Sequence, residues 1–501
     1  MCGYCEARLP GADAFGAAAP MVPDEFYESG DVADAIVRAQ PSEATLGHAY
    51  ASISGSGDRG ASPLDALAWD YVAPKVIDVY LPREDHFVAE RGPDLNERYR
   101  ADALTNRERA AAEMAFADIS AVADVTFNYV DDVADADFAI WSSGARLGGQ
   151  GYWYVGGGGL RVDGTRHTLE GWAWLDNTDR GWSKDGLRKG GDGYGTLVHE
   201  ILHGLGMAHP HDDGGGSEVM EGVRRAFGDY GDFDLNQAVF TMMSYNRGWD
   251  GPNGETGSRL FGGAAGPMAL DIAYLQSVYG ANETTAAGDD TYVLDPTDGR
   301  GGDGTWYEAI WDTGGTDRIV VGDKTKGVVI DLRPATVDYA AGGGGFVSAH
   351  EGVRGGVTIA AGVVIENARG SNADDLLTGN DAANRLDGRG GSDELRGGAG
   401  DDNLRGGRGS DLLDGGTGDD VLKGGGGADL FVFGGDWGAD VIKGYRAGID
   451  ALEFGVESGV SALDDLTVET VGRHVLLSFG EDEILLRRAA ATFDADDLLF
   501  A

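Results

Sequence analysis

A nine-residue period dominates the C-terminal half of the chain and restricts the folds that this half can adopt. In seven consecutive periods, glycine occupies the first position, aspartate or asparagine the sixth, and leucine or phenylalanine the eighth. The glycines are Gly370, Gly379, Gly388, Gly397, Gly406, Gly415 and Gly424; the sixth-position residues are Asp375, Asn384, Asp393, Asp402, Asp411, Asp420 and Asp429; the eighth-position residues are Leu377, Leu386, Leu395, Leu404, Leu413, Leu422 and Phe431. A flexible linker rich in glycine and aspartate does not explain apolar positions in phase, so the period predicts a repeated structural unit.

The residue types in this period are those of a calcium-binding parallel β-roll. Glycine permits tight turns with positive φ, aspartate supplies a hard oxygen ligand, and carbonyl groups of the turns complete a calcium shell. A short strand then directs its leucine inward, as in the RTX nonapeptide repeat G-G-x-G-x-D-x-U-x. We predict an all-β roll over residues 286–435 with several bound Ca²⁺ ions. The expected ligands within the repeats are Asp375, Gly388, Gly390, Asp393, Gly397, Ala399, Asp402, Gly406, Arg408, Asp411, Asp420 and Asp429; Asn384 should weaken the site nearest to it.

The composition excludes several classes of protein. Glycine accounts for 85 of 501 residues but proline for only 13, which excludes collagen. The formal net charge is −45, from 39 basic and 84 acidic residues. Such a surface repels phosphate backbones and anionic lipid and attracts cations, although a halophilic origin is a competing explanation for the acidity. We therefore expect no nucleic-acid binding. Because no stretch of 18 apolar residues is present, we also expect no membrane insertion.

The remaining chain divides into three further regions. Residues 1–40 are predicted to be a leader or pro-segment; they contain the only cysteines, Cys2 and Cys5, and lack the features of an N-terminal signal peptide. Residues 41–285 have the composition of an α+β domain, with helical patterns at 97–125, 195–210 and 267–280. Strands are predicted at 125–130 and 137–143, and an edge strand at 171–177. Residues 436–501 are predicted to form a C-terminal β cap that includes a secretion signal.

The segment from His199 to His209 carries a metal-binding pattern. His199 and His203 are four residues apart, so on a helix both imidazoles lie on one face and can bind one Zn²⁺ ion. Glu200 can reach the metal-activated water as a general base without binding the metal itself. Gly206 allows the chain to turn after the helix and bring in His209 as the third ligand. A position on the zinc then stays open for water and a substrate carbonyl, as catalysis requires.

The full spacing H-E-x-x-H-x-x-G-x-x-H is far more specific than H-E-x-x-H alone. The short pentapeptide arises by chance in unrelated helices, where its histidines are ordinary core or surface residues. The long form is the metzincin signature of zinc peptidases. His211 falls outside this spacing and is expected to be an ordinary loop histidine.

The chain resembles the serralysin family, in which a metzincin zinc-protease domain precedes an RTX β-roll. The resemblance rests on the zinc motif, on the repeats and on the sequence Met243-Ser244-Tyr245 after the third histidine. It implies that Met243 forms a hydrophobic floor under the zinc ligands. It also implies that Tyr245 is a fifth zinc ligand that swings away to stabilise the oxyanion. The first 150 residues match the family only loosely.

The resemblance also implies further calcium ligands and a route of export. The positions that match family calcium ligands are Gly288, Asp290, Asp312, Gly314, Gly315, Asp317 and Glu366. The C-terminal residues 494–501, acidic and then apolar, resemble an uncleaved signal for type I secretion. The same resemblance implies that the protein is made as a zymogen, is a monomer and is inhibited by a small protein.

We therefore expect a secreted, extracellular zinc endopeptidase that hydrolyses peptide bonds of proteins, with one catalytic zinc and several structural calcium ions. The alternative is a non-catalytic RTX adhesin or surface-layer protein. That alternative explains the repeats equally well, but it leaves the zinc motif, Glu200 and Met243 without a role.

Overall fold

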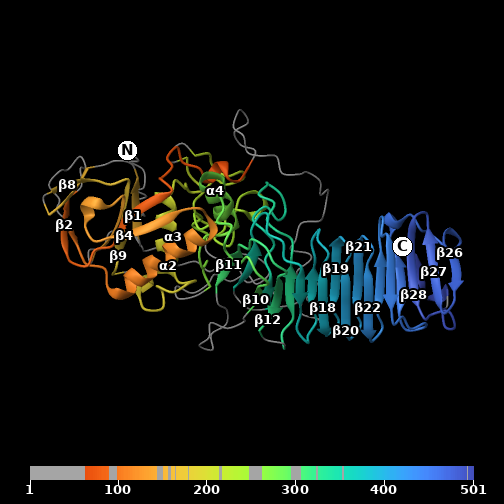
Figure 1. The fold of residues 1–501 in the computed structure, drawn as a ribbon. Helices are drawn as coiled ribbons and strands as arrows, with labels where there is room; N and C mark the ends of the chain where they lie inside the picture. Colours follow the sequence, from red (N-terminus) through yellow and green to blue (C-terminus); the bar gives the residue numbers. More distant parts are fainter. Residues whose placement is uncertain are drawn as a thin grey trace, which may run out of the picture.

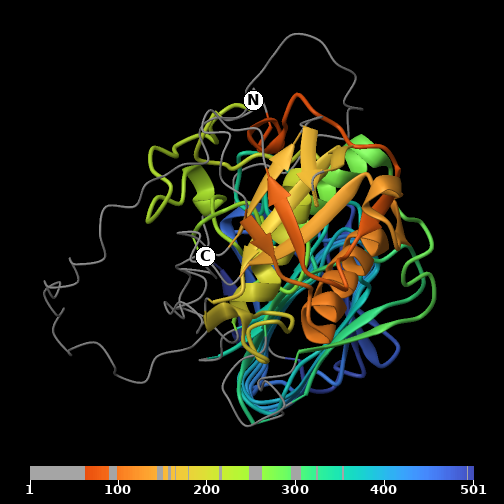
Figure 2. The same ribbon diagram turned by 90° about the vertical axis from the view of Figure 1, so that its left-hand side faces the viewer.

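The computed structural model describes residues 62–89, 99–143, 151–155, 159–163, 165–178, 180–213, 217–246, 262–294, 306–322, 325–351, 355–493 and 495–500. The predicted leader and its two cysteines lie outside these ranges. Figure 1 shows an elongated molecule with helices and a mixed sheet at one end and strands side by side along the rest. Viewed from that end, the N-terminal unit (residues 62–279) lies in front of the other strands (Figure 2).

A five-stranded sheet forms the centre of the N-terminal unit. Its order is β4 (Thr126–Val130), β1 (Val76–Tyr80), β5 (Phe138–Ser143), β9 (Gly171–Asp176) and β6 (Gly151–Val155). The first four strands are parallel, and β6 lies antiparallel to β9 at the edge of the sheet. The prediction of an edge strand at 171–177 is therefore wrong, because β9 pairs on both sides. Its alternating pattern has another cause: Trp172 and Trp174 pack into one apolar cluster, while Ala173 and Leu175 pack into another.

The α-helices of the described residues confirm the three helical patterns. They are α2 (Asn106–Val122), α3 (Asp192–Gly204) and α4 (Ala269–Tyr279). Helix α2 begins nine residues later than predicted. Thr105 and Glu108 form a capping box at its start, and Tyr99–Ala101 before it form a strand of a four-stranded antiparallel sheet. The order in that sheet is β3 (Tyr99–Ala101), β2 (His86–Ala89), β7 (Gly159–Val162) and β8 (Thr165–Thr168).

The C-terminal half is built mainly from two sheets of largely parallel strands. The ten-stranded sheet has the order β10 (Thr291–Leu294), β12 (Arg318–Val321), β16 (Asn367–Arg369), β18 (Arg385–Gly390), β20 (Asn403–Arg408), β22 (Val421–Gly426), β24 (Ala439–Lys443), β28 (Asp482–Arg487), β27 (His474–Phe479) and β26 (Thr467–Val471). The eight-stranded sheet has the order β14 (Ala349–His350), β13 (Val328–Asp331), β17 (Leu376–Thr378), β19 (Glu394–Ala399), β21 (Leu412–Thr417), β23 (Leu430–Phe433), β25 (Ala451–Phe454) and β29 (Leu498–Phe500). A parallel pair, β11 (Tyr307–Ile310) and β15 (Gly356–Ile359), lies outside both sheets.

Strand register explains the nine-residue period. Leu386 pairs with Leu404 in one sheet and Leu395 pairs with Leu413 in the other, so partners are two periods apart. Successive repeats therefore alternate between the sheets. All seven eighth-position side chains are at most 1% exposed, which confirms that they fill the interior of a parallel β-roll.

One apolar core joins the two halves. The same cluster of buried side chains includes Leu205 of the N-terminal unit and Leu404 of the roll. The predicted secretion tail contributes the last strand, β29, which pairs with β25. No helix of the described residues is long and apolar enough to cross a membrane.

Candidate metal centre

Helix α3 carries two histidines of the motif, and a turn that requires glycine brings in the third. His199 and His203 lie one turn apart on α3, which ends at Gly204. Gly206 follows with a φ of 95°. A Cβ atom there would lie 2.1 Å from the carbonyl oxygen of Tyr71, so only glycine fits this turn. The turn places His209 beside the two helical histidines.

The δ nitrogen of each of the three histidines makes a hydrogen bond. His199 and His203 each donate from Nδ1 to a backbone carbonyl oxygen at 2.7 Å. His209 donates from Nδ1 to Oδ2 of Asp212 at 2.9 Å. Carbonyl and carboxylate oxygens can only accept, so each ring carries a proton on Nδ1, and Nε2 is the nitrogen left to bind a metal. The hydrogen bonds thus orient all three rings as metal ligands.

The three lone pairs converge on one point. Nε2 of His209 lies 3.1 Å from Nε2 of His199 and 3.0 Å from Nε2 of His203. Burial and the neighbouring His209 lower the pKa of His199 to about 3, and the same causes lower the pKa of His203 well below its ordinary value. His199 and His203 therefore stay neutral near neutral pH, with a lone pair on each Nε2. A divalent cation with a preference for imidazole nitrogen, such as Zn²⁺, fits this arrangement.

Glu200 follows His199 on α3 and has one carboxylate oxygen without a partner among the described residues. Its side chain is 6% exposed, and Oε2 has no hydrogen-bond partner within the part of the chain that the structure describes. Burial raises the pKa of Glu200 to about 8. A buried carboxyl group with a free oxygen and a pKa near neutrality can exchange a proton with a molecule beside it.

A turn at residues 241–245 brings the predicted methionine and tyrosine to the centre. Met243 is fully buried and belongs to the same apolar cluster as Leu202 of α3. The hydroxyl oxygen of Tyr245 lies 3.1 Å from Nε2 of His209, and the centroids of the two rings are 4.7 Å apart. The structure thus brings Tyr245 to the histidines, and the carbonyl group of Met242 in the same turn accepts a hydrogen bond from His199.

Asp271 on α4 holds this turn in place, and the sequence analysis missed it. Its fully buried carboxylate accepts hydrogen bonds from the Thr241 hydroxyl at 2.6 Å and from the Met242 and Met268 amides at 2.7 and 2.8 Å. Burial raises the pKa of Asp271 to about 7. Two of the three donors come from the turn, which is 29–30 residues away in the sequence, so no local pattern marks this aspartate.

Replacing Asp271 by alanine is expected to lower the unfolding free energy of the N-terminal unit by about 2–4 kcal/mol, because three buried donors would lose their acceptor. Tryptophan fluorescence during urea unfolding in excess calcium measures the change. The matched control is Asp124→Ala, since Asp124 forms an exposed ion pair with Lys75 and should contribute less than about 1 kcal/mol. Equal stability of the Asp271 variant and the wild type would contradict the role of Asp271.

Three more side chains near the zinc motif were not predicted. Asp212 orients His209, and an acid three residues after the last histidine is a signal that could have been used. Trp69 stacks on His203 at 5.0 Å between ring centroids. His211 lies in the loop as expected, but its ring stacks on His209 at 4.9 Å and contacts Tyr245 at 4.5 Å.

The calcium ligands expected near the start of the roll also come together. Ligand oxygens of Asp290, Asp312 and Asp317 lie within 4.8 Å of one another. The amide of Asp317 donates to Oε2 of Glu366 at 2.7 Å, and Oδ2 of Asp317 has no hydrogen-bond partner among the described residues. A Cβ atom on Gly315 would lie 2.1 Å from the carbonyl oxygen of Gly288, so these glycines are also adjacent. Burial and the nearby carboxylates raise the pKa of Asp317 to about 6. Such a group of hard oxygen atoms fits Ca²⁺.

The aspartates of the repeats form two ladders with free oxygen atoms. The amide of Asp393 donates to Oδ1 of Asp411, and the amide of Asp402 donates to Oδ1 of Asp420, each pair being 18 residues apart. In all four aspartates, Oδ2 is buried and has no hydrogen-bond partner in the described chain. Burial raises the pKa of Asp393 and Asp402 to about 8. Rows of buried carboxylate oxygens that lack donors fit cations in the turns on both sides of the roll.

Comparisons with known proteins agree with both sites. The family model of the RTX calcium-binding nonapeptide repeat (4 copies) matches residues 369–404, 396–431 and 405–442. The chain is 33% identical over 290 residues to metallopeptidase AprA of Pseudomonas marginalis, which covers 55% of this chain and 54% of the relative. It is 36% identical over 197 residues to serralysin of Proteus mirabilis, covering 37% of this chain and 35% of the relative. The corresponding values for serralysin C of Dickeya chrysanthemi are 35% over 244 residues, 46% and 43%.

The chain is related to the serralysins. The chain spans about half the length of the AprA and serralysin relatives that it matches. The serralysin relationship agrees with a histidine cluster that suits zinc and with repeats that suit calcium.

Proposed function

We propose that this serralysin relative is a secreted zinc endopeptidase with a metzincin catalytic domain at about residues 41–285. One observation carries the proposal: the Nε2 atoms of three imidazoles converge on one point, and the residue that follows the first of them on α3 is a buried glutamate with an oxygen that has no partner among the described residues. The proposed zinc ligands are His199, His203 and His209. A water molecule would be the fourth ligand, and Tyr245 the fifth. A bound zinc would polarise a peptide carbonyl and acidify water.

Glu200 supplies the proton transfers in this proposal. Its free Oε2 takes a proton from the attacking water and passes it to the leaving amine. The raised pKa of Glu200 suits a group that must first accept and then release a proton near neutral pH. Tyr245 lies within reach of the same site, and its hydroxyl group is placed to donate a hydrogen bond to the tetrahedral oxyanion.

Strand β6 is the proposed partner of an extended substrate, because β9 is paired on both sides. It is the edge strand next to β9, and its free side offers backbone groups to a peptide strand. Main-chain pairing of this kind accepts many sequences, as an endopeptidase of extracellular proteins requires.

The proposal also includes residues 1–40 as a pro-segment, residues 286–435 as the calcium roll and residues 436–501 as a cap with a type I secretion signal. We also propose that the protein is a monomer and that a small protein inhibits it.

Cleavage of casein by the purified chain, with calcium held in excess, tests the proposal. We expect proteolysis that stops when zinc is removed with 1,10-phenanthroline and returns when zinc is added. The alternative of a non-catalytic RTX adhesin predicts no cleavage in any of these states, so a zinc-loaded protein without activity would overturn the proposal.

A further inference from the structure

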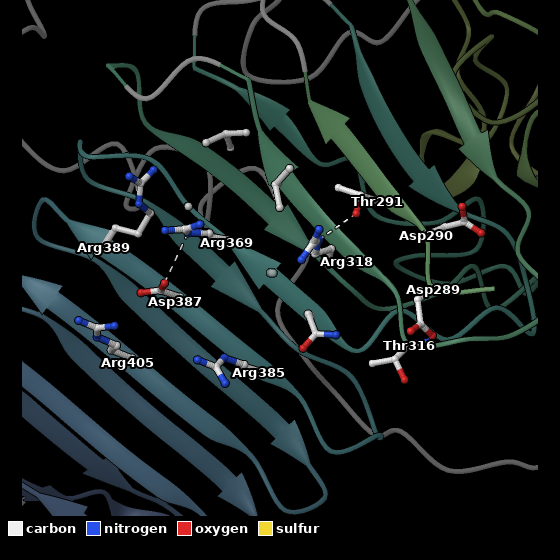
Figure 3. Close-up of a pocket in the computed structure, with 15 residues that line it drawn as sticks. Asp289, Asp290, Thr291, Thr316, Arg318, Arg369, Arg385, Asp387, Arg389 and Arg405 are labelled. Atoms are coloured by element: carbon white, nitrogen blue, oxygen red, sulfur yellow. Dashed lines mark hydrogen bonds and ion pairs between the residues drawn. The ribbon is translucent and has the colours of Figure 1, made fainter. Parts of the chain in front are cut away.

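An arginine-rich cavity lies on the ten-stranded sheet of the roll. It has a volume of about 1020 Å³, and its walls come from residues 289–405, so no zinc-motif residue belongs to it. Five arginines line it, contributed by the neighbouring strands β12, β16, β18 and β20: Arg318, Arg369, Arg385, Arg389 and Arg405. Figure 3 shows these side chains on one face of the sheet. Such a concentration of positive charge is unexpected in a chain with 39 basic and 84 acidic residues.

The arginines face outward, and most lack an internal partner. Arg385 lies beside the buried Leu386, and Arg405 follows the buried Leu404, so both side chains are on the outer face. Arg369 forms an ion pair with Asp387 at 3.5 Å. Within the described residues, Arg385, Arg389 and Arg405 form no ion pair. Asp387 stands between Arg369 and Arg405 in the strand register. Asp289 and Asp290 also line the cavity, so five arginines are set against three aspartates. The remaining positive charge suits an anionic partner.

Arg389 departs from the repeat at a conformational cost. It has a φ of 82°, a conformation that side chains with a Cβ rarely adopt. At the same position of later repeats the chain has Gly398, Gly407, Gly416 and Gly425, all with positive φ. Arginine is less favourable than glycine in this backbone conformation, but it adds a guanidinium group to the cavity. Backbone strain at a single position that lines a cavity points to a function of that side chain.

The geometry points to a linear anionic polysaccharide that carries carboxylates, and we propose that this cavity binds it. The arginines come from consecutive strands spaced by about 4.8 Å. In the strand register, Arg318 and Arg385 share one row across the strands, and Arg369 and Arg405 share another. A narrow chain that lies across the strands therefore meets an arginine at every second strand of a row. Guanidinium groups bind carboxylates through paired hydrogen bonds. Thr291, Thr316 and Asn367 also line the cavity and can bond sugar hydroxyl groups. The site would hold the protein on an acidic extracellular matrix, independently of the proposed peptidase activity.

Other polyanions fit the cavity less well. None of its lining residues is aromatic, so it has no platform on which the bases of a single-stranded nucleic acid could stack. Double-stranded DNA would extend beyond the cavity and meet the acidic remainder of the surface. The ligand should therefore be narrow and lie across the strands.

Fluorescence anisotropy of labelled oligogalacturonate with the full calcium-loaded chain tests the proposal. We expect binding that weakens with added salt. The change Arg389→Gly restores the glycine of the repeat, so it should weaken binding about tenfold while thermal stability stays the same or rises. The double variant R385Q/R405Q should abolish measurable binding without loss of the calcium-dependent circular dichroism signal.

The matched control is Arg396→Gln. Arg396 lies at an equivalent repeat position on the eight-stranded sheet, where it pairs with Glu394, and its replacement should leave binding unchanged. Equal affinity of the wild type and R385Q/R405Q, or equal loss in Arg396→Gln, would overturn the assignment of the cavity. Tighter binding of single- or double-stranded DNA than of oligogalacturonate would overturn the assignment of the ligand.

Discussion

Replacing Glu200 by glutamine is expected to lower kcat/KM for a peptide substrate by about 10²–10⁴-fold, because the amide cannot accept the proton of the attacking water. The substitution keeps the size and burial of the side chain, so the histidine cluster should keep its geometry. Hydrolysis of an internally quenched peptide by the zinc-loaded variant measures the effect. A loss of less than about tenfold would show that another group acts as the base.

A surface glutamate provides the matched control for this experiment. Glu113 is exposed on α2, so Glu113→Gln makes the same chemical change away from the histidines. We expect wild-type kcat/KM for this variant. Zinc content must be the same in both variants and the wild type, so that a lost metal is not mistaken for a lost base.

Removal of calcium is expected to unfold the roll of the full-length chain. The buried Oδ2 atoms of Asp393, Asp402, Asp411 and Asp420 have no hydrogen-bond donor among the described residues. The interior contains only one leucine or phenylalanine per nine residues over the repeats. Without cations, carboxylate repulsion and backbone ordering should exceed the stabilisation from this thin core. Added calcium should restore the β-sheet circular dichroism signal cooperatively at roughly 10⁻⁴–10⁻³ M, the range of extracellular modules.

Two comparisons make the calcium experiment specific. Magnesium at the same concentration should not restore the signal, because it dehydrates reluctantly and demands near-octahedral geometry. Asp402→Asn should raise the calcium midpoint, whereas Asp401→Asn should change it little, because Asp401 is the exposed neighbour of the buried Asp402. A strong β signal in excess chelator that calcium does not change would contradict the coupling.

The calcium-free roll should also respond to pH. Burial raises the pKa of Asp393 and Asp402 to about 8 and that of Asp411 and Asp420 to about 6, against about 3.9 for an unfolded aspartate. A raised pKa in the folded state means that stability is greatest when the groups are protonated and is lost as the pH rises through about 6 to 8. In chelator, the β signal should therefore grow as the pH falls from 8 to 5. A calcium-free chain with more β structure at pH 8 than at pH 5 would exclude this explanation.

Features with a local cause could be predicted from the sequence. The eighth position of each repeat is buried because a fixed register repeats, so Leu404 follows from the period alone. Gly206 and the spacing of the histidines likewise predicted that His199, His203 and His209 come together, since the turn and the helix lie within eleven residues. Features that depend on tertiary order could not be predicted. The alternation of apolar residues in β9 did not reveal its second partner, β6. Asp271 accepts hydrogen bonds from a turn that is 29–30 residues away in the sequence.

The most direct test of the proposed zinc centre is the zinc content of purified protein, measured by mass spectrometry on the wild type, Glu200→Gln and His203→Ala. Because Nε2 of His203 faces the other two histidines and Glu200 binds no metal in this proposal, the predicted result is one zinc per chain in the wild type and in Glu200→Gln. His203→Ala should retain less than about a tenth of that amount, since it loses one of three nitrogen ligands. Full zinc content in His203→Ala, or none in the wild type, would contradict the proposed centre.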